Sequence, residues 1–194
     1  MIDKLRDDAA SVGGKVTLMT GTALICKGAT GSTSYELSGQ IGSVLRWESS
    51  SSSSFEQGKT IANTSTSLQV NLGEVTETTY YRAVVQNGLC NVAYSDVVSI
   101  AVESIPTKFN VTGGGSYCAG GEGVLIGLSS SEVGVTYQLK NGTSAVGSPV
   151  SGTGSALTFG AQKATGTYTV EATRTTGGCT ATMTESVKVT TDAA

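Results

Sequence analysis

Four cysteines are the residues of this chain best suited to chemistry, because two neighbouring thiols can be oxidised to a disulfide. They fall into two pairs at matching positions of two similar segments, Cys26 with Cys90 and Cys118 with Cys179. Closing a loop of about 60 residues stabilises a domain by roughly 4 kcal/mol in the chain-entropy model. The spacing therefore predicts two disulfides, Cys26–Cys90 and Cys118–Cys179. Disulfides persist in oxidising compartments, so we expect an exported protein at the cell surface or outside the cell.

The other reactive residue types form no recognisable site. Histidine is absent, which removes the usual general base and the commonest neutral metal ligand. The cysteines form no C-x-x-C pair, and no acidic calcium-loop pattern occurs. Trp47 could stack on a sugar, but its strand pattern favours a place in the core. We expect a protein that is no enzyme, with no catalytic residues, no metal ligands and no cofactor. The sequence identifies no ligand-binding residues.

Charge and hydropathy exclude two classes of partner. The formal net charge is −3 and the isoelectric point is near 4.9, which argues against binding to nucleic acid. No basic run suggests attachment to a membrane surface, and no apolar stretch is long enough to span one. We expect no nucleic-acid partner and no membrane insertion.

The elements around the cysteines repeat with them. A strand headed by tyrosine precedes each second cysteine, starting at Tyr81 and Tyr168. Apolar residues follow each second cysteine at the same two offsets, and their alternation indicates strands. The repeat therefore predicts one domain duplicated in tandem. The predicted core of the two copies consists of Trp47, Tyr81, Ala83, Val85, Val98 and Ile100, and of Tyr137, Leu139, Tyr168, Val170, Val187 and Val189.

About seven short alternating segments occur in each copy, separated by turn signals such as Asn87-Gly88 and Asn141-Gly142. This pattern predicts an all-β protein with two tandem Ig-like β-sandwich domains, each with one disulfide. We expect a lead-in over residues 1–13, the first sandwich over 14–104 and the second over 105–194. Leu45 and Trp47 are predicted on one strand face. The serine run 49–54 is predicted to be a flexible loop.

Several segments carry a resemblance to a known family. The segments "GSVLRWESS", "TTYYRAVVQNGLC" and "SDVVSIAV" of the first copy resemble the Ig-like repeats of very large cell-surface proteins from Bacteroidetes. The segments "YCAGGEGVLIGLSSSEVGVTYQLK" and "GTYTVEATRTTGGCTATMTESVKVT" resemble a sister repeat of the same proteins. The best-known members are gliding-motility adhesins of the SprB type, which the type IX secretion system exports.

The resemblance covers the chain from about Lys15 to Thr191 and implies a structural and adhesive surface repeat that acts as a rigid, disulfide-clamped spacer. Neighbouring repeats of the same polypeptide are the implied partners, with surface polysaccharide or other surface proteins as further candidates. The opening residues lack the apolar core of a signal peptide, so we expect a fragment of a longer precursor. The alternative function is a carbohydrate- or protein-binding accessory module of a secreted multidomain enzyme.

Overall fold

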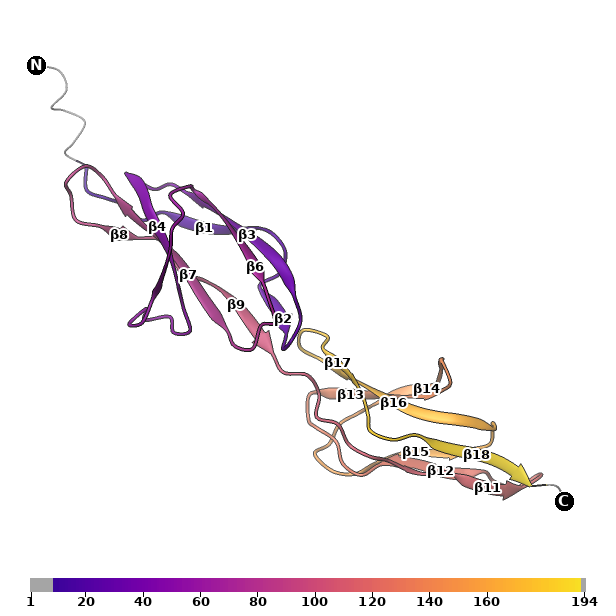
Figure 1. The fold of residues 1–194 in the computed structure, drawn as a ribbon. Helices are drawn as coiled ribbons and strands as arrows, with labels where there is room; N and C mark the ends of the chain where they lie inside the picture. Colours follow the sequence, from indigo (N-terminus) through magenta and orange to yellow (C-terminus); the bar gives the residue numbers. More distant parts are fainter. Residues whose placement is uncertain (1–8, 193–194) are drawn as a thin grey trace, which may run out of the picture. The chain divides into compact units, whose positions relative to one another are not determined.

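A computed structural model of the chain describes residues 9–192. It divides into two compact units, unit 1 from Met1 to Glu103 and unit 2 from Ser104 to Ala194 (Figure 1). Residues 9–192 form strands and turns without any helix, which confirms the predicted all-β class. Most of the predicted lead-in, residues 1–8, lies outside the described residues. Within its described part, Val12 forms a β-bridge with Ile41 and so belongs to unit 1.

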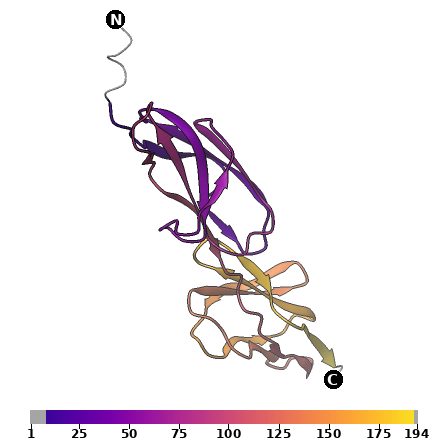
Figure 2. The ribbon, with the colours of Figure 1, turned by 60° about the vertical axis from the view of Figure 1, so that its left-hand side comes forward.

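Unit 1 is a sandwich of two sheets, which Figures 1 and 2 show as two layers. One sheet has the order β1-β3-β6, and the other has the order β2-β9-β7-β4-β5 with β8 paired to β7. The strands are β1 (Lys15–Thr20), β2 (Leu24–Cys26), β3 (Gly31–Ser38), β4 (Ser43–Ser50), β5 (Lys59–Ile61), β6 (Ser67–Leu72), β7 (Thr79–Gln86), β8 (Ala93–Tyr94) and β9 (Val98–Glu103).

Unit 2 repeats this topology strand for strand. Its sheets have the orders β10-β12-β15 and β11-β18-β16-β13-β14, with β17 paired to β16. The strands are β10 (Val111–Gly113), β11 (Gly115–Cys118), β12 (Val124–Leu128), β13 (Val135–Asn141), β14 (Ser144–Ser151), β15 (Leu157–Gln162), β16 (Gly166–Arg174), β17 (Thr180–Thr182) and β18 (Val187–Asp192). The strand order of unit 1 therefore recurs with each number raised by nine.

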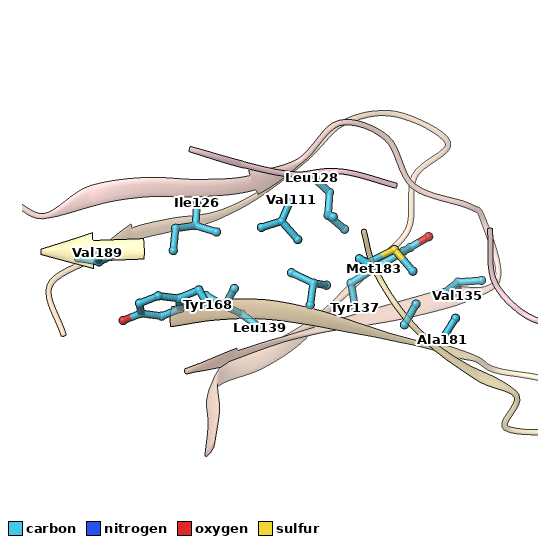
Figure 3. Packing of buried hydrophobic residues seen from close by; sticks show 12 residues of the cluster. Val111, Ile126, Leu128, Val135, Tyr137, Leu139, Tyr168, Ala181, Met183 and Val189 are labelled. Carbon is cyan, nitrogen blue, oxygen red and sulfur yellow. The ribbon is translucent and has the colours of Figure 1, made fainter. Parts of the chain in front are cut away.

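The core of each unit lies between its two sheets and contains the predicted alternating residues. Tyr81 and Tyr168 occupy the same register position, because each lies opposite the first residue of the last strand, Val98 or Val187. Both tyrosines are buried, and the two valines pack against them as partly buried residues. Figure 3 shows Ile126, Leu128 and Val111 of the facing sheet directed toward Tyr168, Leu139 and Tyr137. The predicted core is thus confirmed in both units.

Two local predictions for β4 were wrong. A β-bulge between Val44 and Arg46 shifts the register, so that Leu45 is 40% exposed while Trp47 is fully buried. A bulge adds one residue to a strand, so the side chains beyond it point to the opposite face of the sheet. The alternation of apolar residues alone does not reveal a bulge. The predicted serine loop is also partly ordered, since β4 continues through the buried Ser50.

The sandwich is closed by a parallel pairing of an early strand with the last strand. In unit 1, β2 pairs with β9 in parallel, with Leu24 opposite Ala101 and Cys26 opposite Glu103. In unit 2, β11 pairs with β18 in the same way and places Cys118 opposite Asp192. The first cysteine of each unit therefore lies beside the end of the last strand, and this placement decides the disulfide chemistry.

Candidate functional site

The cysteines do not pair as the sequence predicts. Cys26 and Cys179 are disulfide-bonded, whereas Cys90 and Cys118 carry free thiols. The predicted bridges Cys26–Cys90 and Cys118–Cys179 are therefore absent, and the prediction of one disulfide within each domain was wrong.

The length of the sandwich explains the error in unit 1. Cys26 lies opposite Glu103, three residues beyond Ile100, and Ile100 faces Thr79 at the start of β7. Cys90 lies in the turn after the other end of β7, where its backbone N–H donates to Asn87 O at 2.9 Å. The eight residues of β7 span about 25 Å at roughly 3.3 Å per residue. A disulfide needs Cα atoms within about 7 Å, so these two cysteines cannot bond within the folded unit.

Unit 2 repeats this separation. Cys118 ends β11 beside Asp192, next to the start of β16, where Gly166 faces Val189. Cys179 lies past the far end of β16, and its carbonyl accepts the N–H of Arg174 at 2.8 Å. Figure 1 shows β11 and β17 at opposite ends of unit 2, as β2 and β8 are in unit 1. Each unit thus carries one cysteine at each end.

The outer face of β4 and β7 holds a carboxylate, Glu48, that is paired with two arginines. Glu48 accepts from both Nε and an NH2 nitrogen of Arg46, at 3.0 and 2.7 Å. It also accepts from Nε of Arg82 at 2.9 Å and pairs with an NH2 nitrogen of that guanidinium at 2.8 Å. Burial alone would raise the pKa of Glu48, but the hydrogen bonds and charges of Arg82 and Arg46 outweigh it and lower the pKa. The carboxylate therefore stays ionised at neutral pH.

Aromatic rings fix the position of Arg82. Its guanidinium carbon lies 4.1 Å from the ring centroid of Phe55 and 3.9 Å from that of Tyr94. Both distances are within the range of cation–π attraction. Phe55 lies in the loop after β4, has a positive φ of 56° and is buried. Its contact with Arg82 therefore holds this loop against the sheet. The sequence does not reveal this cluster, because only the strand pairing brings Phe55, Arg82 and Tyr94 together.

A small polar pocket lies beside this cluster, at the end of β4. Its volume is about 190 Å³. Serine hydroxyls, an amide, an ammonium group and a carboxylate surround it, and the lining residues are Ser49, Ser50, Ser51, Gln57, Lys59, Glu77 and Thr79. These groups can donate and accept hydrogen bonds but include no base paired with a nucleophile. The pocket is therefore lined mainly by polar groups that can hydrogen-bond.

Unit 2 has its own charged site at its first residues. Glu132 accepts from the hydroxyl of Thr107 at 2.5 Å, from its backbone N–H at 3.2 Å and from Arg174 at 3.1 Å. The Thr107 hydroxyl contributes most to lowering the pKa of Glu132, and Arg174 adds to it. Arg174 also donates from Nε to the carbonyl of Ser104 at 2.9 Å. The carboxylate thus fixes the segment that enters unit 2.

Two aromatic residues of the unit 1 core differ in how their polar atoms are satisfied. Trp47 is fully buried and donates from Nε1 to Ser65 O at 2.9 Å, so it belongs to the core and is no sugar platform. The hydroxyl of Tyr35 is buried and has no hydrogen-bond partner. Burial, together with the neighbouring Tyr81, raises the pKa of Tyr35 to about 12. Tyr35 therefore remains neutral and unsatisfied at neutral pH.

Between residues 9 and 192, no three His, Cys, Asp or Glu side chains are grouped so that they could hold a metal ion. The same part of the chain contains no helix long and apolar enough to cross a membrane.

Comparison with known proteins identifies the fold. The model of a family described as Domain of unknown function (DUF8696) matches residues 15–104. No curated protein matches the chain. A chain of the crystal structure of mouse coronavirus receptor-binding domain complexed with its murine receptor is 11% identical with a TM-score of 0.54, and the match covers 92% of this chain and 100% of that one.

Two further structures are similar. Murine CEACAM1b is 12% identical with a TM-score of 0.49, and the match covers 92% of this chain and 100% of that one. The fibronectin(III)-like modules of Clostridium thermocellum CbhA are 13% identical with a TM-score of 0.46, covering 92% and 94%. At such low identity a match bears on the fold alone, and the first of the three supports it. The chain consists of Ig-like β-sandwich modules.

Proposed function

We propose that the chain is a structural and adhesive repeat segment of a bacterial cell-surface adhesin and carries tension between its neighbours. It has no catalytic role in this proposal. The observation that carries the proposal is the parallel pairing of β2 with β9 and of β11 with β18. An early strand and the last strand are neighbours that run in the same direction. Tension applied to the two ends of a unit therefore pulls them in opposite senses.

This geometry loads the backbone hydrogen bonds between the two strands together and in shear. In unit 1 the ladder includes the bond from Ala101 N to Ala23 O and the bond from Lys27 N to Glu103 O, both at 2.8 Å. Breaking it requires several bonds to fail at once, whereas strands pulled apart sideways lose them one at a time. In this proposal, the resistance of a unit to unfolding under tension comes from the hydrogen-bonded ladder. It needs no disulfide inside a module, so the ladder takes the role of the disulfide clamp expected from the sequence.

The finer assignment follows from the family resemblance. On that resemblance we propose a gliding-motility adhesin of the SprB type, exported by the type IX system and displayed at the cell surface. The disulfide-bonded Cys26 and Cys179 support an oxidising location. The proposed partners are neighbouring repeats of the same polypeptide, and surface polysaccharide or other surface proteins.

Single-molecule force spectroscopy tests the tension-bearing role. Lys27→Pro removes the N–H that donates to Glu103 and should lower the unfolding force of unit 1. Lys27→Ala keeps that N–H and is the matched control, and unit 2 is an internal reference in the same molecule. An unchanged unfolding force for unit 1 in the Lys27→Pro variant would contradict the proposal that this ladder bears the tension.

The accessory-module alternative has one observation in its favour, the polar pocket around Ser49–Ser51. Its hydroxyl, amide and charged groups are those that hydrogen-bond a sugar. Lys59 would offer the ligand a positive charge, and Glu77 would offer it a negative charge. Screening the chain against a glycan array tests this function, with the double variant Lys59→Ala/Glu77→Ala as control. Binding that the double variant abolishes would favour the accessory role over a purely mechanical one.

A further inference from the structure

Strand β6 is the most open sheet edge in the part of the chain that the structure describes. It lies at the end of the sheet β1-β3-β6, so one of its sides has no neighbouring strand. The other edge strands either have only two to four residues or, like β1, β14 and β15, carry a break in their register. By contrast, β6 pairs with β3 over six residues without a break, and it contains no charged residue and no proline. Such an edge is open to pairing with another chain.

The backbone groups of β6 point alternately toward β3 and toward the open side. The N–H of Leu37 donates to Thr66 O at 2.8 Å, so the even-numbered residues of β6 are the ones bonded to β3. The odd-numbered residues therefore face the open side. Ser67 agrees with this assignment, because its N–H donates to Ser65 Oγ at 3.1 Å and its carbonyl accepts from Asn63 Nδ2 at 3.0 Å. Side chains of the preceding loop thus occupy the first open position.

Gln69 and Asn71 are the other two residues of β6 that face the open side. Among residues 9–192, no group is bonded to their backbone N–H or carbonyl on that side. Their side chains are exposed, whereas Val70 between them is partly buried against the core. A row of unpaired donors and acceptors along an edge is what an added strand bonds to.

The equivalent strand of unit 2, β15, is closed to such pairing. Its register breaks opposite β12, and Gly160 within it has a φ of 79°. The N–H of Gly160 donates to Thr158 Oγ1 at 3.2 Å, and the side-chain amide of Gln162 donates to Phe159 O at 3.0 Å. Side chains of β15 therefore occupy its own backbone groups. The open edge is thus a property of unit 1 that unit 2 does not share.

We propose that β6 pairs with β6 of a second copy of this chain, antiparallel and about a twofold axis. Gln69 of each copy lies opposite Asn71 of the other, and the two residues exchange N–H···O=C bonds. Val70 then lies opposite its own counterpart, and this register pairs every open donor with an open acceptor. A shift by two residues would instead place an open group opposite Ser67, whose groups are occupied, or opposite Gly73, beyond the strand. The edge is therefore complementary to itself, as a twofold contact requires.

The test measures the mass of the whole chain by sedimentation equilibrium at concentrations up to about 1 mM, where a weak interface is detectable. Every sample carries Cys90→Ser and Cys118→Ser, so that oxidation of the two free thiols does not link chains. The mass should rise from monomer to dimer with concentration. Hydrogen exchange followed by NMR should show the backbone amides of Gln69 and Asn71 protected only where the dimer is populated.

One pair of variants tests the backbone bonds. Asn71→Pro removes an N–H on the open side and leaves the bonds to β3 in place, so the dissociation constant should rise at least about tenfold. Asn71→Ala keeps that N–H and is the matched control. Its dissociation constant should stay close to that of the parent.

A second pair of variants tests the register without altering the backbone. Gln69→Glu/Asn71→Lys places opposite charges across the interface and should dimerise at least as well as the parent. Gln69→Lys/Asn71→Lys places like charges opposite each other and should dimerise at least about tenfold more weakly. Both side chains are exposed, so neither variant should change the melting temperature of the monomer appreciably.

Three outcomes would overturn the proposal: a monomer at every concentration, equal dimerisation of Asn71→Pro and Asn71→Ala, or equal dimerisation of the two charge variants. The inference does not depend on the tension-bearing role, because β6 takes no part in the pairing of β2 with β9. Failure of this dimer would therefore leave the force measurement on Lys27→Pro unaffected.

Discussion

The outer face of the larger sheet differs between the two units, although their strand orders are the same. In unit 1 this face carries Glu48 with two arginines, and Arg82 is stacked between Phe55 and Tyr94. Arg82 faces Glu48 across the strands, and the corresponding pair in unit 2 is Thr169 and Lys140.

In unit 2 this face carries an ion pair between Lys140 and Glu171, with each side chain one-third exposed. The inner faces instead keep tyrosine and aliphatic residues at matched registers. The inner face therefore specifies the sandwich, whereas the outer face carries different interactions in the two units. The stacked cluster of unit 1 is therefore the feature that distinguishes it from unit 2.

The largest expected effect tests whether the two cores are equivalent. Tyr81→Ala and Tyr168→Ala should each lower the free energy of unfolding of their unit by about 3 kcal/mol or more, because both remove a buried aromatic ring. Fluorescence of Trp47, the single tryptophan, follows unit 1 in a denaturant titration, and hydrogen exchange of unit 2 peptides follows unit 2. Leu125→Ala, at a 66% exposed side chain, is the control. A loss well below 1 kcal/mol for one tyrosine would break the equivalence.

The charged clusters of the outer faces should differ in strength. Glu48→Ala leaves two arginines without their carboxylate, and the Glu48 side chain is only 11% exposed. We expect a loss of about 2 kcal/mol, between the values typical of exposed and of buried pairs. Glu171→Ala in unit 2 should cost less than about 1 kcal/mol, because its pair is more exposed. Equal losses in the same denaturant titrations would show that the stacked cluster adds nothing.

The pH dependence of the two units should be similar in sign but should depend on different carboxylates. The pKa of Glu48 and that of Glu132 are both lowered in the folded protein from a usual value of 4.5. Their stabilising contribution is therefore complete above pH 4.5 and is lost as the pH falls through the folded-state pKa. Glu48→Gln should flatten the acid limb of unit 1 alone, and Glu132→Gln that of unit 2 alone, in unfolding titrations repeated across acidic pH. An effect of either variant on the other unit would contradict the assignment.

The smallest effect concerns two buried tyrosine hydroxyls. Tyr35 O–H in unit 1 has no partner, whereas the hydroxyl oxygen of Tyr137 in unit 2 accepts from Glu132 N at 2.9 Å. Tyr35→Phe should therefore leave unit 1 unchanged or stabilise it by up to about 1 kcal/mol, since it removes an unsatisfied buried group. Tyr137→Phe should destabilise unit 2 by about 1 kcal/mol. Thermal unfolding of the two variants measures the difference, and a destabilising Tyr35→Phe would reveal a hidden partner of that hydroxyl.

Local pattern was sufficient for the predictions that depend on neighbouring residues. Alternation placed Tyr81, Ala83 and Val85 on one face, because successive side chains of a strand point to opposite sides. It failed at Leu45, because a bulge in β4 changes the register with no signal in the sequence. The hairpin predicted at Asn141-Gly142 was correct in place, but its two loop residues are Gly142 and Thr143, since Asn141 pairs with Ser144 and the positive φ of 61° falls on Gly142.

The stacked cluster shows why the candidate site was not predictable. Glu48, Arg82 and Tyr94 belong to three different strands, and Phe55 belongs to a loop. Each residue alone resembles an ordinary surface or loop residue. Only the pairing of β4 with β7 and of β7 with β8 brings the four side chains into contact.

The sequence by itself determined the all-β class, the duplication and the inner faces, because these depend on composition and on periods of two residues. The tertiary structure alone decided the state of the cysteines. Cys26 and Cys90 have matching counterparts in Cys118 and Cys179, which suggested pairing within each copy. The parallel ladder of β2 with β9 instead places Cys26 at one end of a sandwich about 25 Å long and leaves Cys90 at the other. A disulfide requires two cysteines that lie close together in space, and the number of residues between them does not give that distance.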